Sequence, residues 1–444
     1  MSCQPRGGQV RKLVAFLEEV MVGTLAEADD LWRFDYDPVW ASRSDAFDLS
    51  PSLPRAQLAH VDGASTRSVQ WYFDNLLPEE AMRETVAQEA GLQVEDSFAL
   101  LEYLGAESAG SLLLLPDGQA PPAQGKVRAL TDASLCERIR NMSRIPLTRQ
   151  SPKRMSAAGA QNKLLVVYRD GLLFEPEGHQ ASTHLLKPDH PSADYPATVI
   201  NEFVTMRLAA RLGLPVPAVQ RRYTPEPVYI VERFDRVTDA GGRTRRLHII
   251  DACQLLNKSR GFKYSAATLQ TLQAVVAACR NRARTRLQLF NWLVFNVLVG
   301  NHDNHLKNLS FRVGQEGIEL APAYDLLCTA VYNTRAFAHE RANWPAVDLA
   351  IALPGARNFA GVTREALLLA GMELGIARRA CEHALGSLAG ALPAELAAEV
   401  GEVERQNAGL PKAAHRFLAR ELRLLRVMQH LIVPEMLQRI AVLR

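Results

Sequence analysis

The sequence predicts an α+β protein with a small N-terminal α+β module, a β-rich lobe and a mostly helical lobe. Three observations support this order. The chain has 444 residues, 48% of them apolar, which is enough for two or three domains. Short apolar runs bounded by turn residues fill residues 164–231. After about residue 247, longer runs with helical spacing dominate.

The first expected unit covers residues 8–116. Residues 10–25 hold β-type runs interrupted at Gly23, which predicts strand, turn and strand. A helix should begin near Glu79 and Glu80, because acidic side chains in a first turn favour the helix dipole. The Pro- and Gly-rich residues 116–125 then predict a domain boundary.

The second expected unit, residues 126–236, is the β-rich lobe. Asp170 and Gly171 separate two apolar runs, which is a strong hairpin signal. A further strand should end at Pro188, and a helix should end before Gly213. The ranges assigned to these elements are 164–168, 172–174, 184–187 and 228–231 for strands and 199–212 for the helix.

The third expected unit, residues 237–444, is the helical lobe. It has one predicted interruption, a hairpin formed by residues 309–313 and 318–320. Its predicted helices cover residues 287–299, 364–374, 377–389 and 415–431.

The strongest functional signal is the run of residues 300–308, Gly-Asn-His-Asp-Asn-His-Leu-Lys-Asn. It places Asp303 five positions before Asn308, the spacing of a protein-kinase catalytic loop. In such a loop the Asp accepts the proton of the attacking hydroxyl and the Asn binds magnesium. The predicted hairpin should carry a second carboxylate, Asp325, back beside Asn308. We therefore expect a protein-kinase-like two-lobed fold and ATP-dependent phosphoryl transfer.

Other parts of a kinase site can be assigned along the β-rich lobe. Lys187, near the end of its strand, is a candidate cation for the ATP phosphates, and Glu202 is its candidate acidic partner. The segment joining the lobes, where adenine usually binds backbone groups, contains Glu232 and Phe234. A small-residue loop before the first hairpin strand could bring backbone amides close to phosphate oxygens; its residues are Ser156, Ala157, Ala158, Gly159, Ala160, Gln161, Asn162 and Lys163.

Taken together, these residues resemble the HipA family of bacterial serine/threonine kinases, the toxins of type II toxin–antitoxin systems. Ordinary kinases have His-Arg before the catalytic Asp and Asp-Phe-Gly at the second one, whereas this chain has Asn301-His302 and Asp325-Leu-Leu, as HipA proteins do. The resemblance spans nearly the whole chain. The matching segments are residues 156–163, 184–188, 201–203, 231–236, 300–308 and 322–326, with 34–37, 75–78 and 100–105 in the N-terminal module.

The resemblance implies a role for each matching residue. Asp303 would be the catalytic base, with Asn308 and Asp325 on Mg²⁺. Lys187 and the loop residues Ala158, Gly159, Ala160 and Gln161 would hold the ATP phosphates, while Glu232 and Phe234 would contact adenine. Ser156 matches the autophosphorylated serine of the family, and a phosphate there would oppose ATP binding by like charge.

The same resemblance implies partners. A HipB-like helix-turn-helix antitoxin would silence the kinase, and operator DNA could be bound through it. The family's usual targets belong to the translation machinery, including aminoacyl-tRNA synthetases, so the enzyme (EC 2.7.11.1 type) would be a growth-arresting toxin linked to persistence. Two arginine-rich stretches could touch DNA phosphates or could be solvated helix faces: Arg280, Arg282, Arg284 and Arg286, and Arg416, Arg420, Arg423 and Arg426.

Two other functions are compatible with the sequence. The chain could be a catalytically weak corepressor that acts with an antitoxin on DNA, although Lys187, Asp303, Asn308 and Asp325 are all present. It could also be a metal-dependent hydrolase that uses His302, Asp303 and His305 as ligands. The six scattered cysteines, the mild net charge of +3 and the lack of a long apolar run favour a cytoplasmic protein with no membrane segment.

Overall fold

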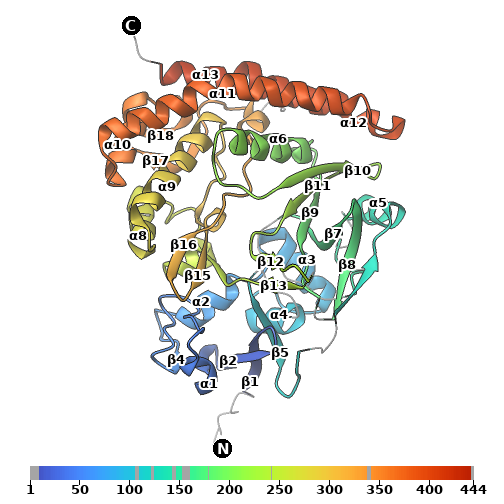
Figure 1. Cartoon of the computed structure of the whole chain (residues 1–444), viewed down its shortest axis with the longest axis vertical. Coiled ribbons are helices and arrows are strands. Elements are labelled where there is room, and N and C mark those ends of the chain that lie inside the picture. The colour runs from blue at the N-terminus through green and yellow to red at the C-terminus, as the bar shows by residue number, and fades with distance from the viewer. Residues whose placement is uncertain are drawn as a thin grey trace, which may run out of the picture.

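A computed structural model of the chain describes residues 10–105, 110–121, 125–142, 147–152, 161–178, 180–241, 243–337 and 342–441. Its elements form a lower N-terminal module, a β-rich lobe and a helical lobe (Figure 1). The order along the chain is the predicted one, and the fold is the expected α+β, two-lobed fold of protein-kinase type with an extra N-terminal module.

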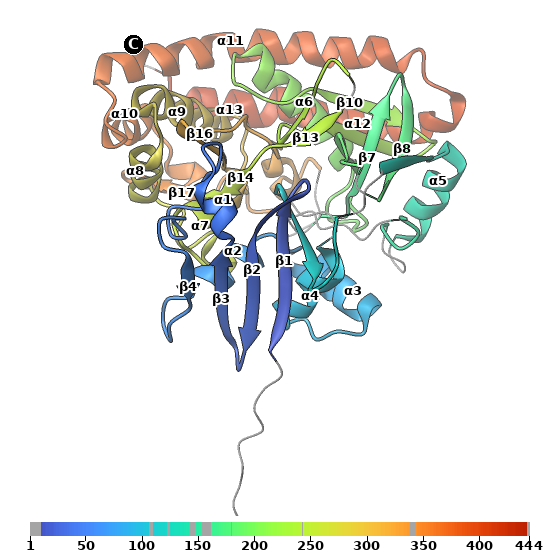
Figure 2. The ribbon, with the colours of Figure 1, turned by 60° about the horizontal axis from the view of Figure 1, so that its bottom comes forward.

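The N-terminal module is an antiparallel sheet with strand order β4-β3-β2-β1-β5, seen from below in Figure 2. The expected turn at Gly23 is wrong: the chain turns at Glu18 and Glu19, and Gly23 lies inside β2. A Cβ at Gly23 would collide with the carbonyl oxygen of Asp35 on β3, so the close strand approach requires glycine. The elements are β1 (Arg11–Leu17), β2 (Val20–Ala28), β3 (Leu31–Tyr36), α1 (Pro38–Ser42), β4 (Ala59–Val61), α2 (Ser68–Asp74), α3 (Glu80–Ala90), α4 (Ser97–Leu104) and β5 (Leu112–Pro116).

The β-rich lobe is a six-stranded sheet with order β10-β11-β9-β7-β8-β6. The hairpin predicted around Asp170 and Gly171 is confirmed, with both residues at positive φ between β7 and β8. Helix α6 packs against β10 and β11, as in Figure 1. The elements are β6 (Gly125–Ala129), α5 (Asp132–Asn141), β7 (Leu164–Arg169), β8 (Leu172–Gly178), β9 (His184–Pro188), α6 (Thr198–Arg211), β10 (Val219–Tyr223) and β11 (Pro227–Glu232).

The chain then crosses into the helical lobe. A two-stranded ribbon, β12 (Arg236–Thr238) and β13 (Thr244–Arg246), comes first. The predicted hairpin is confirmed as β15 (Ser310–Gly314) and β16 (Gly317–Leu320), and β14 (Ile249–Asp251), which was not expected, pairs with it. The helices are α7 (Ala252–Leu255), α8 (Leu269–Ala278), α9 (Arg282–Leu298), α10 (Arg364–Glu373), α11 (Arg378–Asn407), α12 (His415–Val427) and α13 (Val433–Arg439), with a second small ribbon of β17 (Asp348–Leu353) and β18 (Ala356–Asn358).

Three predicted helices have different bounds. The helix expected over 287–299 is α9, which begins five residues earlier, at Arg282. The helix expected to end at residue 389 is α11, which continues through Pro393 to Asn407 because Leu392, Leu396 and Val400 keep an apolar stripe in the core. The helix expected over 415–431 is α12 followed by a π-helical turn, Met428–Ile432, and then α13. No helix within the described ranges is long and apolar enough to cross a membrane.

The N-terminal module packs directly on the helical lobe. Buried side chains of both belong to one continuous hydrophobic core, which also includes α6 of the β-rich lobe, and a second, smaller core lies under α5. Polar contacts reinforce this junction: Gln254 donates to Tyr72 O at 2.8 Å, and Asn75 donates to Lys258 O at 3.0 Å. The end of α2 is thereby held beside α7 and the residues that follow it.

The helical lobe gives a stability prediction at a close helix contact. A Cβ on Gly371 of α10 would lie 2.5 Å from Cys381 Sγ and 2.8 Å from Phe290 Cε2. We expect Gly371→Ala to lower the free energy of unfolding by about 1–3 kcal/mol, measured by chemical denaturation.

Gly386 on α11 is the matched control, because no neighbouring atom lies within 4 Å of its Cβ position. Gly386→Ala should instead stabilise the protein, by up to about 1 kcal/mol, because alanine is the better helix former. Equal effects of the two substitutions would contradict the close packing of α10 against α9 and α11.

Candidate active site

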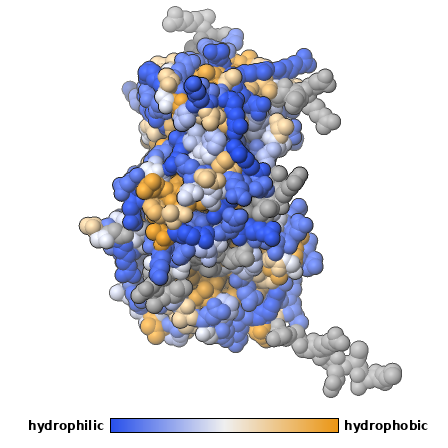
Figure 3. Space-filling view, turned by 90° about the vertical axis from the view of Figure 1, so that its right-hand side faces the viewer, coloured by the Kyte–Doolittle hydropathy of each residue, from blue (hydrophilic) through white to orange (hydrophobic). Residues whose placement is uncertain are grey.

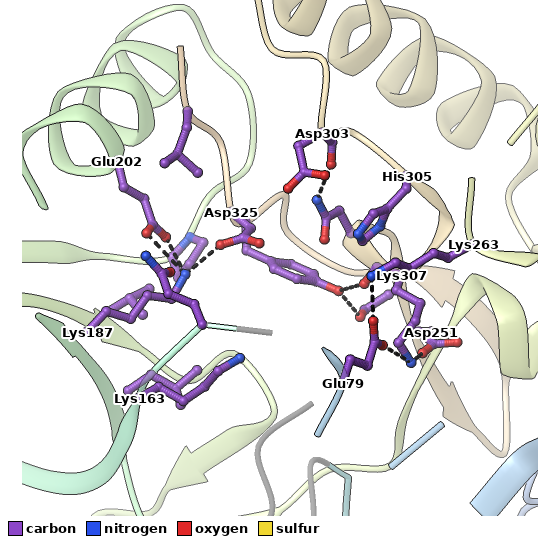
Figure 4. A pocket seen from close by; sticks show the side chains of 18 of the residues that line it. Glu79, Lys163, Lys187, Glu202, Asp251, Lys263, Asp303, His305, Lys307 and Asp325 are labelled. Carbon is purple, nitrogen blue, oxygen red and sulfur yellow. Dashed lines mark hydrogen bonds and ion pairs between the residues drawn. The ribbon is translucent and has the colours of Figure 1, made fainter. Parts of the chain in front are cut away.

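A cavity of about 670 Å³ lies where the three parts of the chain meet. The β-rich lobe contributes side chains from β7, β9 and β11, and the helical lobe contributes residues 302–308 and 324–332. Unexpectedly, the N-terminal module also lines it, through Asn75, Leu76, Glu79 and Glu80. Figure 4 shows that the charged side chains gather in two groups on opposite sides of the cavity, with Asp303 at its upper edge.

The first group centres on Lys187, at the end of β9. Its ammonium lies 2.8 Å from Glu202 Oε1 on α6 and 2.5 Å from Asp325 Oδ1. Burial alone would lower the pKa of Lys187, but Asp325 and Glu202 outweigh it and raise that pKa. Lys187 therefore stays charged, and the predicted pairing of Lys187 with Glu202 is present in the structure.

Asp325 is held in an uncommon backbone conformation beside this lysine. Its φ is +58°, in the left-handed region that costs a non-glycine residue about 1–3 kcal/mol. Burial would raise the pKa of the Asp325 carboxyl, but Lys187 outweighs burial and lowers it. The strain is offset by this ion pair, which turns a carboxylate into the cavity.

Lys163, immediately before β7, also lines the cavity and is half-buried. Burial and the neighbouring charge of Lys187 lower its pKa to about 8. Two cationic side chains thus lie on one side of the cavity, as Figure 4 shows. Lys163 was not predicted from the sequence as a separate site residue, because it was only the last residue of the predicted loop. The available signal was the position of Lys163 directly before a β-rich run.

The loop of residues 300–308 is fixed by its own side chains. Asn301 is buried, and its Oδ1 accepts from the Asp303 backbone N–H at 3.0 Å. The Asn308 Nδ2 donates to the Asp303 carbonyl oxygen at 2.7 Å, which closes the loop between the two motif residues. Gly300 begins the loop at φ +70°, where a Cβ would press on Ala330 and Ile432. The Asp303 carboxylate is thereby turned toward the cavity.

The second charged group surrounds Lys307, which is buried. Its ammonium lies 2.5 Å from Asp251 Oδ2 and 3.3 Å from Glu79 Oε1, and it donates to Asn75 Oδ1 at 2.9 Å. Burial would raise the pKa of Glu79, but Lys307 and Lys263 outweigh it and lower that pKa. Glu79 of the N-terminal module is therefore ion-paired with Lys307, which lies in the loop of residues 300–308 of the helical lobe.

Lys263 and Tyr264 complete this side of the cavity. Lys263 Nζ lies 2.6 Å from Glu79 Oε2 and 2.7 Å from Glu80 Oε1. The Tyr264 hydroxyl donates a short hydrogen bond to Asp303 Oδ1. None of these five residues was predicted as a site residue: Glu79, Asp251, Lys263, Tyr264 and Lys307. Lys307 lies within the run of residues 300–308 but is not one of its two motif positions, and the other four lie outside any recognised motif.

Other predicted residues fall in two classes. Glu232, Phe234 and Gln161 line the same cavity, with the Phe234 ring 5.4 Å from the Tyr324 ring. Ser156, Ala158, Gly159 and Ala160 lie outside the described residues, so the phosphate-loop and autophosphorylation assignments stay predictions.

The hydrolase alternative needs a converging ligand set. His302 Nε2 instead lies 3.1 Å from Asn333 Nδ2, and the His305 ring packs edge-on against Tyr264. Within the described part of the chain, no group of three or more His, Cys, Asp or Glu side chains is arranged to hold a metal ion. The structure therefore gives this alternative no support.

The arginines considered for DNA contact lie on two separate helical surfaces. Arg282 and Arg284 are exposed at the start of α9, and Arg286 is half-buried there. Arg416, Arg420, Arg423 and Arg426 are exposed on α12, where Arg416 pairs with Glu226 and Arg423 binds the Ala336 carbonyl. On the face of the molecule in Figure 3, hydrophobic residues form scattered groups among hydrophilic ones.

The two lobes and the cavity between them define a protein of the kinase-like fold class. The family comparison then specifies it: a model of the HipA-like C-terminal domain matches residues 155–396, and a model of the HipA N-terminal domain matches residues 13–115. The chain belongs to the HipA family.

Similar proteins agree with this assignment. The chain is 38% identical to a protein of Sinorhizobium fredii named as a kinase, Y4mE, over 67% of this chain and 72% of that one. It is 32% identical to the serine/threonine-protein kinase toxin HipA of Shewanella oneidensis, over 71% and 75% of the two chains. The solved structure of a Shewanella oneidensis HipA complex with HipB and operator DNA matches with a TM-score of 0.75 and 28% identity, over 97% of this chain and all of that one. Kinase activity is thus supported for the family.

The ion pairs of Lys307 give a prediction about the junction of the three parts. Lys307→Met would leave Asp251 and Glu79 buried without this cation. Loss of one partner of a buried pair typically costs about 3–5 kcal/mol, so we expect a clearly lower denaturation midpoint by fluorescence and circular dichroism.

Lys412→Met is a suitable control, because Lys412 is exposed on the surface of the helical lobe. It should change stability by less than about 0.5 kcal/mol. If both variants unfold at the same denaturant concentration as the unsubstituted protein, the Lys307 cluster does not stabilise the junction.

Proposed function

We propose that the chain is a serine/threonine protein kinase that transfers the γ-phosphoryl group of ATP to a serine hydroxyl of a protein. The observation that carries the proposal is the meeting of Asp303 and Asn308 with Lys187, Glu202 and Asp325 around one cavity. These groups come from both lobes, as phosphoryl transfer between a nucleotide and a second substrate requires. Asp303 would accept the proton of the attacking hydroxyl.

The residues of the cavity fit ATP and Mg²⁺. The Asn308 amide nitrogen is used by the Asp303 carbonyl, so its Oδ1 is the atom that can bind a cation, and Asp325 adds a carboxylate. Two protein oxygen ligands suit Mg²⁺, which usually keeps several waters and binds phosphate oxygens as well. When bound, the ion would neutralise charge that develops on the phosphates. Lys187, next to Asp325, and Lys163 would orient the phosphates.

Adenine would bind at the end of β11. The Glu232 backbone N–H already donates to the Ala218 carbonyl at 2.9 Å. Glu232 can therefore offer adenine its carbonyl oxygen, and Phe234 its N–H. With the domain bounds 8–116, 126–236 and 237–444, which remain our prediction, this segment lies at the end of the second unit, next to the third.

The partners and the regulation of this chain can be proposed from its membership of the HipA family. A Shewanella oneidensis relative is named a kinase toxin, and its structure contains HipB and operator DNA. We propose a HipB-like helix-turn-helix antitoxin and operator DNA as partners of this chain, phosphorylation of Ser156 as its silencing step, and a translation protein such as an aminoacyl-tRNA synthetase as its substrate. A corepressor without catalysis is the second candidate, favoured only by the DNA in that complex.

The test of the proposed function is phosphate transfer dependent on Asp303. Purified protein, first shown by intact mass to be unmodified, is incubated with Mg-ATP and mapped by peptide mass spectrometry. We expect one added phosphate, at Ser156, because the loop that holds it precedes a cavity lysine. Asp303→Ala should lack it, since no base would remain to accept the hydroxyl proton. ATP binding without any phosphate on the unsubstituted protein would favour the corepressor.

A second prediction concerns the phosphate-binding lysine. Lys187→Met should weaken binding of a non-hydrolysable ATP analogue by about 1.5–3 kcal/mol, the usual contribution of a charged hydrogen bond. Isothermal titration calorimetry with Mg²⁺ measures this directly. Lys126→Met, on an exposed position of β6, is the control and should leave the affinity unchanged. Unchanged affinity in Lys187→Met would remove this lysine from the ATP site.

A further inference from the structure

Tyr264 makes a contact with Asp303 that the proposed phosphoryl transfer does not use. Its hydroxyl donates to Asp303 Oδ1, while its ring packs edge-on against His305 with 4.8 Å between the ring centres. Burial of the hydroxyl and the negative charge of Asp303 raise the pKa of Tyr264, so the phenol keeps its proton. A catalytic base must accept a hydrogen bond from the hydroxyl that it deprotonates. Tyr264 therefore places a hydroxyl where a substrate hydroxyl has to bind.

The segment that carries Tyr264 is anchored on both sides. Lys263 binds Glu79 and Glu80, and Arg260 Nε lies 2.8 Å from Asp74 Oδ2, so three acids of the N-terminal module hold it. On the other side, the Leu306 backbone N–H donates to the Lys263 carbonyl at 3.1 Å, which connects the segment to the loop of residues 300–308. The position of the tyrosine is thus set jointly by the N-terminal module and by the loop of residues 300–308.

The Tyr264 side chain can nevertheless move away from Asp303. Tyr264 is 46% exposed, and Phe262, two residues earlier, is 53% exposed, so the tyrosine lies at the surface rather than in the core. Rotation of the side chain toward solvent would free Asp303 Oδ1 without disturbing a packed core.

We propose that Tyr264 occupies the acceptor position of Asp303, and that a substrate hydroxyl must displace it before phosphoryl transfer. This inference rests on the proposed function, in which Asp303 is the base. Tyr264 is a positioning residue: it selects against weak acceptors such as water and yields to a hydroxyl that a protein substrate holds in place. Lys263 keeps the tyrosine there by fixing its segment to Glu79 and Glu80.

The test uses water as the probe acceptor. In ATP hydrolysis, a water oxygen bonds to the γ-phosphorus, the bond from that phosphorus to the bridging oxygen of ADP breaks, and Asp303 takes the proton of the water. Tyr264→Phe keeps the ring contact with His305 but removes the competing hydroxyl. We expect the Mg-ATPase rate of the full chain to rise about tenfold, since the competing bond is to a charged group.

Two further variants make the result specific. Lys263→Met releases the same segment and should also raise the rate, and its effect should not add to that of Tyr264→Phe, because both act by freeing one carboxylate. Tyr223→Phe is the matched control: its hydroxyl also binds a carboxylate, Glu421 at 2.6 Å, but outside the cavity, so the rate should stay the same.

The outcomes separate this inference from the function on which it rests. Asp303→Ala should abolish hydrolysis in every background; retained hydrolysis would overturn the role of Asp303 and the inference with it. Asp303-dependent hydrolysis at an unchanged or lower rate in Tyr264→Phe would overturn the inference alone, because a tyrosine that only supports the loop could not slow the reaction. A raised, Asp303-dependent rate supports it.

Discussion

The structure depends on how buried ammonium groups are neutralised around one cavity. Lys187 and Lys307 are both buried, and each lies against two carboxylates that come from other segments of the chain. A buried charge without a partner would cost several kcal/mol, so these pairs constrain the relative positions of β9, α6, the loop of residues 300–308 and the start of α3. The same requirement that stabilises the junction places Asp303, Asn308 and Asp325 around a shared space.

The sequence predicted the parts of this arrangement that have local signals. The hairpin at Asp170 and Gly171 and the order of the lobes were read from turn residues and hydrophobic spacing, and the spacing of Asp303 and Asn308 identified the loop. Lys187 and Glu202 were paired by expectation from kinase architecture, and their ion pair is present in the structure.

What the sequence could not show depends on tertiary contacts. The turn was misplaced to Gly23 because glycine signals both turns and close approach, and only the neighbouring strand distinguishes them. Helix α11 passes Pro393 because its apolar stripe continues, which a local rule for proline misses. Glu79 lies at the start of α3, whereas Lys263 and Tyr264 lie in a segment of the helical lobe, and the two parts of the cavity wall meet only after folding.

The N-terminal module helps to line the cavity, which matters when this module is exchanged between homologous proteins. Asp74, Glu79 and Glu80 come from the module, whereas Arg260, Lys263 and Lys307 come from the helical lobe, and each is paired across the junction. A chimera that takes its module from one homologue and its lobes from another would inherit mismatched charges unless both sets were transferred together. Acids and bases on the two sides of this junction should consequently change in step as the proteins diverge.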